Sequence, residues 1–96
     1  MGLADMAARA ERAQRAREAL KQDLAGRVVT RRDAHGLVEI GVDTSAQVVE
    51  VAVNASSVGR VDPKLLAQAV LEAATSAQRA ARELVAERRS YHLGVE

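Results

Sequence analysis

The sequence predicts a single α+β domain made of a helix, a three-stranded antiparallel meander and a long second helix. Three observations support this prediction. Residues 3–24 are rich in Ala, Arg, Glu and Leu without Pro or Gly, residues 27–54 alternate β-branched and polar side chains, and Asp62-Pro63 introduces another Ala-rich run. A chain of 96 residues has room for one domain, which we place at 1–96.

The first helix is expected at about 3–24, because its residue types are strong helix formers. At about 100° per residue, its apolar side chains share one face. These are Leu3, Met6, Ala10, Ala13, Leu20 and Leu24. Gly26 follows as a residue suited to the left-handed conformation that often ends a helix.

Three strands are expected near 27–32, 37–43 and 47–54, separated by the turn sequences "DAHG" and "DTSA". Short connections between consecutive strands favour antiparallel pairing. Alternation places one set of side chains on one face: Val38, Ile40 and Val42, then Val49, Val51 and Val53. The opposite face should then carry Leu37, Glu39, Gly41 and Asp43, then Val48, Glu50, Ala52 and Asn54. "ASSVGR" at 55–60 is interpreted as a loop.

The second helix is expected at about 63–89, with a flexible tail at 90–96. Asp62 is a favourable N-cap, and Pro63 suits the first helical position because its missing N–H has no intrahelical acceptor there. Val61 and Leu66 have the spacing of a hydrophobic staple. The predicted apolar stripe is Leu66, Ala69, Val70, Ala73, Ala77, Ala80, Ala81 and Leu84, with Leu66 and Val70 covering the valine face of the sheet.

The composition limits the core that this chain builds alone. Hydrophobic residues make up 48% of the sequence, but 20 residues are Ala, and Phe and Trp are absent. Small domains with thin cores often depend on disulfides, a metal or a second subunit. Because the sequence has no Cys and only two His, we predict a homodimer. The sequence contains neither the roughly 20 apolar residues of a membrane span nor the apolar segment of a signal peptide, so we expect a cytoplasmic protein.

The order of these features resembles the YbaB/EbfC family of nucleoid-associated proteins. The resemblance covers roughly residues 3–86 and depends on the charged first helix, the strand "GLVEIGVD", the following Val-rich strand and the helix start "VDPKLLAQAVLEAA". It implies a YbaB-like dimer with projecting helices that binds DNA with limited sequence preference in the nucleoid. The hairpin that in the family often reads Asp-Gly-x-Gly is "DTSA" in this chain.

Charge is distributed unevenly, although the net charge is only +1. Residues 1–32 have a net charge of +4, and residues 33–76 have a net charge of −4. Arginine binds phosphate in a bidentate manner, and several phosphate contacts made together favour DNA binding. The candidate DNA-binding residues are Arg9, Arg12, Arg15, Lys21, Arg79, Arg82 and Arg89, and Arg88 is expected to add to the same surface.

A solvated helix is the alternative explanation of the arginines in the first helix. Glu11 and Arg15 have the i, i+4 spacing of a surface ion pair. Arg17 falls within the apolar face. Either its stem covers apolar atoms, or it marks the point where the helix leaves the core, and the second interpretation is preferred.

Catalysis is not indicated by the sequence. His35 and His92 stand apart from any nucleophile at an interpretable spacing. Asp33 with His35 suggests a metal site less well than it suggests a polar turn. We therefore expect no enzyme activity, no cofactor and no metal.

Two functions remain open. The first is a homodimer that binds double-stranded DNA through Arg-rich helices with little sequence specificity. The alternative is a module that binds another protein and has weak or no DNA affinity, which the low net charge favours.

Overall fold

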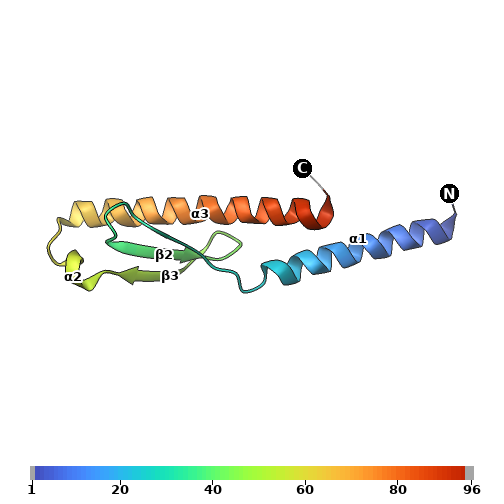
Figure 1. Cartoon of the computed structure of the whole chain (residues 1–96), viewed down its shortest axis with the longest axis horizontal. Coiled ribbons are helices and arrows are strands. Elements are labelled where there is room, and N and C mark those ends of the chain that lie inside the picture. The colour runs from blue at the N-terminus through green and yellow to red at the C-terminus, as the bar shows by residue number, and fades with distance from the viewer. Residues whose placement is uncertain (1, 95–96) are drawn as a thin grey trace. The chain divides into compact units, whose positions relative to one another are not determined.

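The computed structural model describes residues 2–94 and has the predicted order of elements. Helix α1 (Leu3–Leu24) precedes strands β1 (Val29–Arg32), β2 (Val38–Val42) and β3 (Val48–Val53), which are followed by a short helix α2 (Ala55–Val58) and a long helix α3 (Pro63–Leu93). The strands form one antiparallel sheet in the order β1-β2-β3. Figure 1 labels β2 and β3 beside α3. The prediction of a helix, a three-stranded meander and a long helix is confirmed.

The chain divides into two compact units. One comprises Gly26–Leu84 and contains the sheet, α2 and most of α3. The other comprises Met1–Ala25 with Val85–Glu96, of which residues 2–25 and 85–94 are described. Helix α3 therefore contributes residues to both units.

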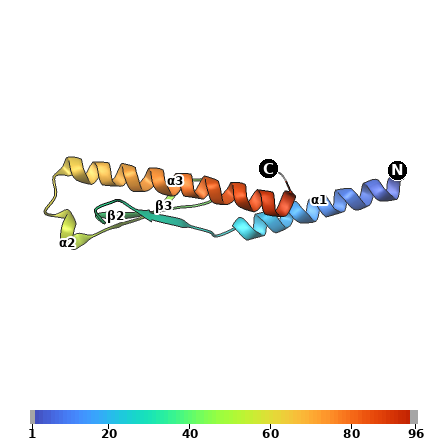
Figure 2. The same cartoon turned by 45° about the horizontal axis from the view of Figure 1, so that its top comes forward.

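The core of the sheet unit is the packing of α3 on β2. Ala69, Ala73, Ala77 and Ala81 are 0–3% exposed and form one cluster with Val38, Ile40 and Val42. Both views show α3 running alongside the sheet (Figures 1 and 2). A spacing of four residues follows one ridge of a helix. Because alanine ends at Cβ, the helix contacts the strand along this ridge through methyl groups alone.

The line of contact is narrower than the predicted stripe. Leu66 packs against the core only in part, and Val70 is 38% exposed, so the prediction that Val70 covers the valine face is wrong. Val70 is turned about 100° from Ala69 around the helix, so its side chain points away from the line of contact. Leu37, expected on the other face, is buried beside Val38. It precedes β2, so the alternation of the strand does not apply to it.

Strand β3 forms one edge of the sheet, and all six of its residues are exposed. A β-bulge changes the predicted alternation. Val53 and Val51 pair with Val38 and Ile40, but Val42 pairs with Val48, and Val49 is the extra residue. Val48 therefore shares the face of Val51 and Val53, contrary to the simple period of two. The face of the sheet that α3 covers at β2 is therefore about half exposed at the valines of β3.

Two aspartates organise the turns at the two ends of β2. Asp33, which is buried, accepts hydrogen bonds from the N–H groups of Val38 (2.8 Å) and His35 (3.0 Å). Asp43 accepts from the hydroxyl and N–H of Ser45 and from the N–H of Gln47. The polar-turn interpretation of Asp33 and His35 agrees with this geometry.

Side chains of α3 hold both turns. The carboxylate of Glu72 accepts a hydrogen bond from the N–H of Ala34 at 2.6 Å, and the amide of Gln78 donates to the carbonyl of Ala46 at 3.1 Å. Ala46 has φ +65°, a left-handed conformation that favours glycine. The hydrogen bond from Gln78 thus holds the turn at the last residue of "DTSA".

The helix ends agree with the local sequence. The carboxylate of Asp62 accepts from the N–H of Lys64 at 2.8 Å, as an N-cap does, and Gly26 has φ +74° just after α1. Residues 55–58, expected as loop, form α2 because the side chain of Asn54 accepts from the N–H of Ser56. Helix α3 continues to Leu93, four residues beyond the predicted end and into the segment expected as a tail.

Enlarging the alanine ridge is expected to destabilise the protein. Ala77 is 0% exposed, so Ala77→Leu should lower the free energy of unfolding by about 1–3 kcal/mol through overpacking. Ala67→Leu, at an exposed position of the same helix, should change it by less than about 0.5 kcal/mol. Urea denaturation at one fixed protein concentration measures both values. Equal effects of the two substitutions would contradict the packing described.

The turn aspartates predict a dependence of stability on pH. Burial alone would raise the pKa of Asp33, but N–H donors of Val38, His35 and Leu37 outweigh it and lower that pKa. Hydrogen bonds from Ser45 and Gln47 lower the pKa of Asp43. Because both folded values lie below the unfolded pKa of about 3.9, this stabilisation is complete above that value and is lost as the pH falls through the folded pKa.

We therefore expect Asp33→Asn to lower the urea midpoint at pH 7, with a difference from wild type that shrinks as the pH falls below about 4. Glu83→Gln, at an exposed position of α3, serves as the control for loss of one carboxylate. A midpoint difference for Asp33→Asn that stays constant between pH 7 and about pH 2 would count against this role.

Candidate nucleic-acid interface

The cations of α1 lie on a helix that buries none of its residues. Arg9, Arg12, Arg15 and Lys21 are all exposed. Among the described residues, neither Arg9 nor Arg12 takes part in an ion pair. Their guanidinium groups therefore keep their full set of N–H donors for a ligand.

The predicted surface pair of Arg15 and Glu11 is present but weak. The distance between Arg15 Nη1 and Glu11 Oε2 is 3.9 Å, and each side chain is 72% exposed. Such i, i+4 pairs contribute about 0.3–0.5 kcal/mol. Phosphate would displace this carboxylate at low cost.

Arg17 is also exposed, and its guanidinium donates to Gln14 Oε1 at 3.1 Å. A hydrogen bond to a neighbouring exposed residue favours the interpretation that this part of α1 has left the core. The alternative, a stem covering apolar atoms, has less support, because Leu3 and Met6 on the same face are 85% and 57% exposed.

The cations of α3 differ from one another. Arg79, Arg82 and Arg89 are exposed, as a DNA-binding role requires. Arg88 is half-buried, and its Nε lies 2.5 Å from Asp23 Oδ2. The expectation that Arg88 adds to the surface of the other three is therefore not supported by its contacts.

Asp23, near the end of α1, contacts residues near the end of α3 that are far from it in the sequence. Its Oδ2 also lies 2.8 Å from His92 Nε2. The Arg88 guanidinium lies over the Tyr91 ring, 4.4 Å from its centroid, and Tyr91 and His92 are in edge contact. Sequence reasoning missed this cluster, because 65 and 69 residues separate Asp23 from Arg88 and His92. The nearest feature in the sequence is Gly26, three residues after Asp23, and a glycine at a helix end is not specific for such a cluster.

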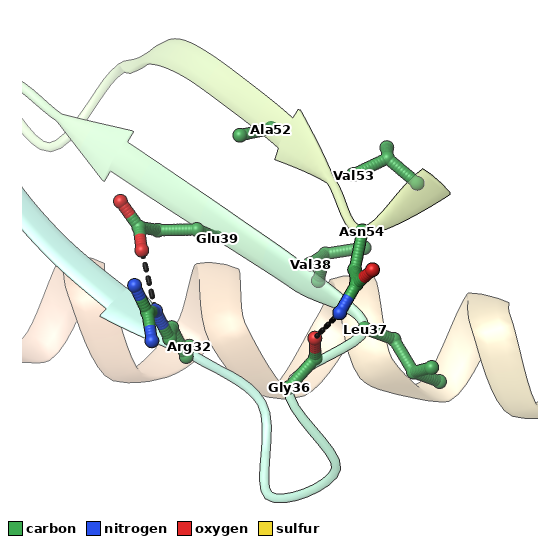
Figure 3. Close-up of a pocket in the computed structure, with 8 residues that line it drawn as sticks. All are labelled: Arg32, Gly36, Leu37, Val38, Glu39, Ala52, Val53 and Asn54. Carbon is green, nitrogen blue, oxygen red and sulfur yellow. Dashed lines mark hydrogen bonds and ion pairs between the residues drawn. The ribbon is translucent and has the colours of Figure 1, made fainter. Parts of the chain in front are cut away.

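A shallow cavity of about 250 Å³ lies on the sheet beside the turn at residues 33–36. Its lining residues are Arg32, Gly36, Leu37, Val38, Glu39, Ala52, Val53 and Asn54 (Figure 3). Arg32 Nε donates to Glu39 Oε2 at 2.5 Å, and this carboxylate raises the pKa of Arg32. The amide of Asn54 donates to the carbonyl of Gly36 at 3.5 Å. The polar groups of the cavity thus bind one another.

Asp33 and His35 are the pair that the sequence suggested as a weak candidate for a metal site. Residues 2–94 contain no group of three or more His, Cys, Asp and Glu side chains placed to hold an ion. Asp33 and His35 share a turn, but the Asp33 carboxylate is occupied by backbone N–H groups.

Comparison with known families identifies the chain. The family model described as the YbaB/EbfC DNA-binding family matches residues 1–94. The chain belongs to the YbaB/EbfC family. This family consists of DNA-binding, nucleoid-associated proteins and is not known for enzymatic activity. The suspected resemblance is confirmed over nearly the whole sequence.

A solved structure supports the fold of this YbaB/EbfC protein. It is the crystal structure of the uncharacterized protein HP0035 from Helicobacter pylori, with a TM-score of 0.62 and 14% sequence identity. The match covers 95% of this chain and 91% of that one, and it bears on the fold alone. The search of curated proteins returned no match. Within residues 2–94, none of the helices has the length and apolar character needed to cross a membrane.

Proposed function

We propose that this YbaB/EbfC protein is a nucleoid-associated homodimer that binds double-stranded DNA with little sequence specificity. The observation that carries the proposal is the exposure of Arg9, Arg12 and Arg15 on a helix that buries nothing, in a chain that belongs to a DNA-binding family. Exposed guanidinium groups without strong internal partners are suited to phosphate. Lys21, Arg79, Arg82 and Arg89 complete the proposed surface.

Low sequence specificity follows from the side chains available. Phosphate contacts position a protein on DNA, whereas specificity requires contacts to base edges or a DNA deformation. Tyr91 is the single aromatic residue of the chain, so stacking on bases along a single strand has no series of platforms. Double-stranded DNA is therefore the proposed partner, and the nucleoid of the cytoplasm is the proposed location.

The homodimer is supported by the surface of β3. Val48, Val49, Val51 and Val53 are 46–58% exposed along one edge of the sheet. An apolar edge strand is a site of pairing or aggregation unless something covers it. A second copy of the chain would bury these valines and double the number of arginines that meet DNA together.

Reversing three charges on α1 should abolish binding. We expect Arg9→Glu/Arg12→Glu/Arg15→Glu to lower affinity for a duplex at least 100-fold. Each phosphate contact that is lost leaves counterions on the DNA that binding would otherwise release. Fluorescence anisotropy with labelled duplex measures this, and sedimentation tests that the dimer persists. Single charge reversals provide a matched control. Arg60→Glu, in the exposed turn before α3, should lower affinity for the duplex less than Arg12→Glu does, because Arg60 is outside the proposed DNA-binding surface. Unchanged binding by the triple variant would remove α1 from the interface.

A charge on β3 should separate the dimer. Val51 is 58% exposed and shares the α3-facing side of the sheet through its pairing with Ile40, whereas Ala52 faces the other side beside Glu39. We expect Val51→Glu to sediment as a monomer, because a buried unpaired carboxylate is costly, and Ala52→Glu to remain a dimer. A Val51→Glu variant that remains dimeric would place the interface elsewhere.

Binding of another protein is the second candidate function. Leu71 is 69% exposed on α3, and Val70 beside it is 38% exposed, which leaves apolar surface for a partner. Affinity purification distinguishes the two functions. Recovery of one stoichiometric protein with little nucleic acid favours this alternative, whereas co-purifying DNA that high salt removes favours the first.

A further inference from the structure

The cluster around Asp23 brings a carboxylate to two side chains in the last turns of α3. Arg88 Nε at 2.5 Å and His92 Nε2 at 2.8 Å share the same oxygen of Asp23. All three residues belong to the same compact unit. The Asp23 carboxylate is thus an anionic partner already bound to Arg88, the sequence neighbour of Arg89 in the proposed DNA surface.

The burial of the cluster separates it from the surface pairs of the protein. The side chain of Asp23 is 13% exposed and that of Arg88 is 26% exposed, compared with 72% for both members of the Arg15–Glu11 pair. Ion pairs shielded from water interact more strongly and are screened less by salt. Phosphate therefore competes less effectively for Arg88 than for Arg15.

The Tyr91 ring holds Arg88 further. The guanidinium carbon lies 4.4 Å from the ring centroid, so one face of the group is covered while its Nε edge binds Asp23. A cation held over an aromatic ring gains stability from the ring quadrupole. Four of the five N–H donors of this guanidinium remain, but its charge is already balanced by Asp23 and its position is fixed by the carboxylate and the ring.

We propose that Asp23 acts as an internal competitor of DNA phosphate and withholds Arg88 from the DNA-binding surface. This inference rests on the proposed function and sharpens it. Among the cations near the end of α3, Arg82 and Arg89 contact DNA, whereas Arg88 does so only when the Asp23 carboxylate is removed. The competitor limits affinity and the number of phosphates bound.

Asp23→Ala and Glu18→Ala form a matched pair that tests the proposal. Each removes one carboxylate from α1, but Glu18 is exposed and takes part in no ion pair among the described residues. We expect Glu18→Ala to raise affinity for a duplex slightly, and Asp23→Ala to raise it about three- to tenfold more. The plot of log K against log salt should become steeper by about 0.9 for Asp23→Ala alone, the value for one added phosphate contact.

Arginine substitutions give an independent readout that does not depend on the folding of Asp23→Ala. We expect Arg88→Ala to bind DNA within about twofold of wild type, whereas Arg89→Ala binds several-fold more weakly because it loses a phosphate contact. The double variant Asp23→Ala/Arg88→Ala should bind like Glu18→Ala.

The outcomes separate this inference from the proposed function. Equal or lower affinity of Asp23→Ala relative to Glu18→Ala, or a loss of binding in Arg88→Ala as large as in Arg89→Ala, overturns the role of Asp23. Failure of wild type and every variant to bind duplex DNA overturns the proposed function itself.

Discussion

The packing of four alanines of α3 against β2 is the constraint on which the rest of the structure depends. Because Ala69, Ala73, Ala77 and Ala81 end at Cβ, the helix contacts the strand along one narrow ridge and buries Ile40 and Val42 completely. From this position on the strand, Glu72 and Gln78 of the same helix form hydrogen bonds with the turns on either side of β2. The geometry of the turns and the placement of α3 are therefore coupled.

The same constraint leaves surface for function. A ridge one residue wide covers β2 but not β3, so the valines of the edge strand remain half exposed. Helix α1 takes no part in this core, and its arginines are not needed for packing. Stability is thus concentrated in the contact between α3 and β2, whereas the arginines of α1 are free to be selected for binding. The proposed division of roles, with a core of small residues and arginines outside it, agrees with membership of a DNA-binding family.

Local signals in the sequence predicted most of the fold. Asp62-Pro63 placed the start of α3, and the alternation of Val38, Ile40 and Val42 placed the buried face of β2, because capping and strand period depend on neighbouring residues. The bulge at Val49 and the burial of Leu37 were not predictable, since both arise from how one segment fits another. The separation of Val70 from the core has the same origin.

In the candidate interface, too, the sequence predicted features set by neighbouring residues and missed those set by tertiary contacts. Exposure of Arg9, Arg12 and Arg15 was expected from a charged face of a helix, and each is exposed. The difference between Arg88 and Arg89 was not expected, because it depends on a carboxylate 65 residues away. Adjacent residues of one type thus acquire different proposed roles through a tertiary contact that no local pattern encodes.

The most direct test of the account is the affinity of wild-type protein for two duplexes of unrelated sequence, measured across a range of salt concentrations. Binding through several arginine–phosphate contacts predicts similar affinities for the two duplexes and a decrease of log K with log salt of about 0.9 for each phosphate contacted. A shallow salt dependence, or a preference of about 1,000-fold for one sequence, would contradict binding through the exposed arginines to the DNA backbone.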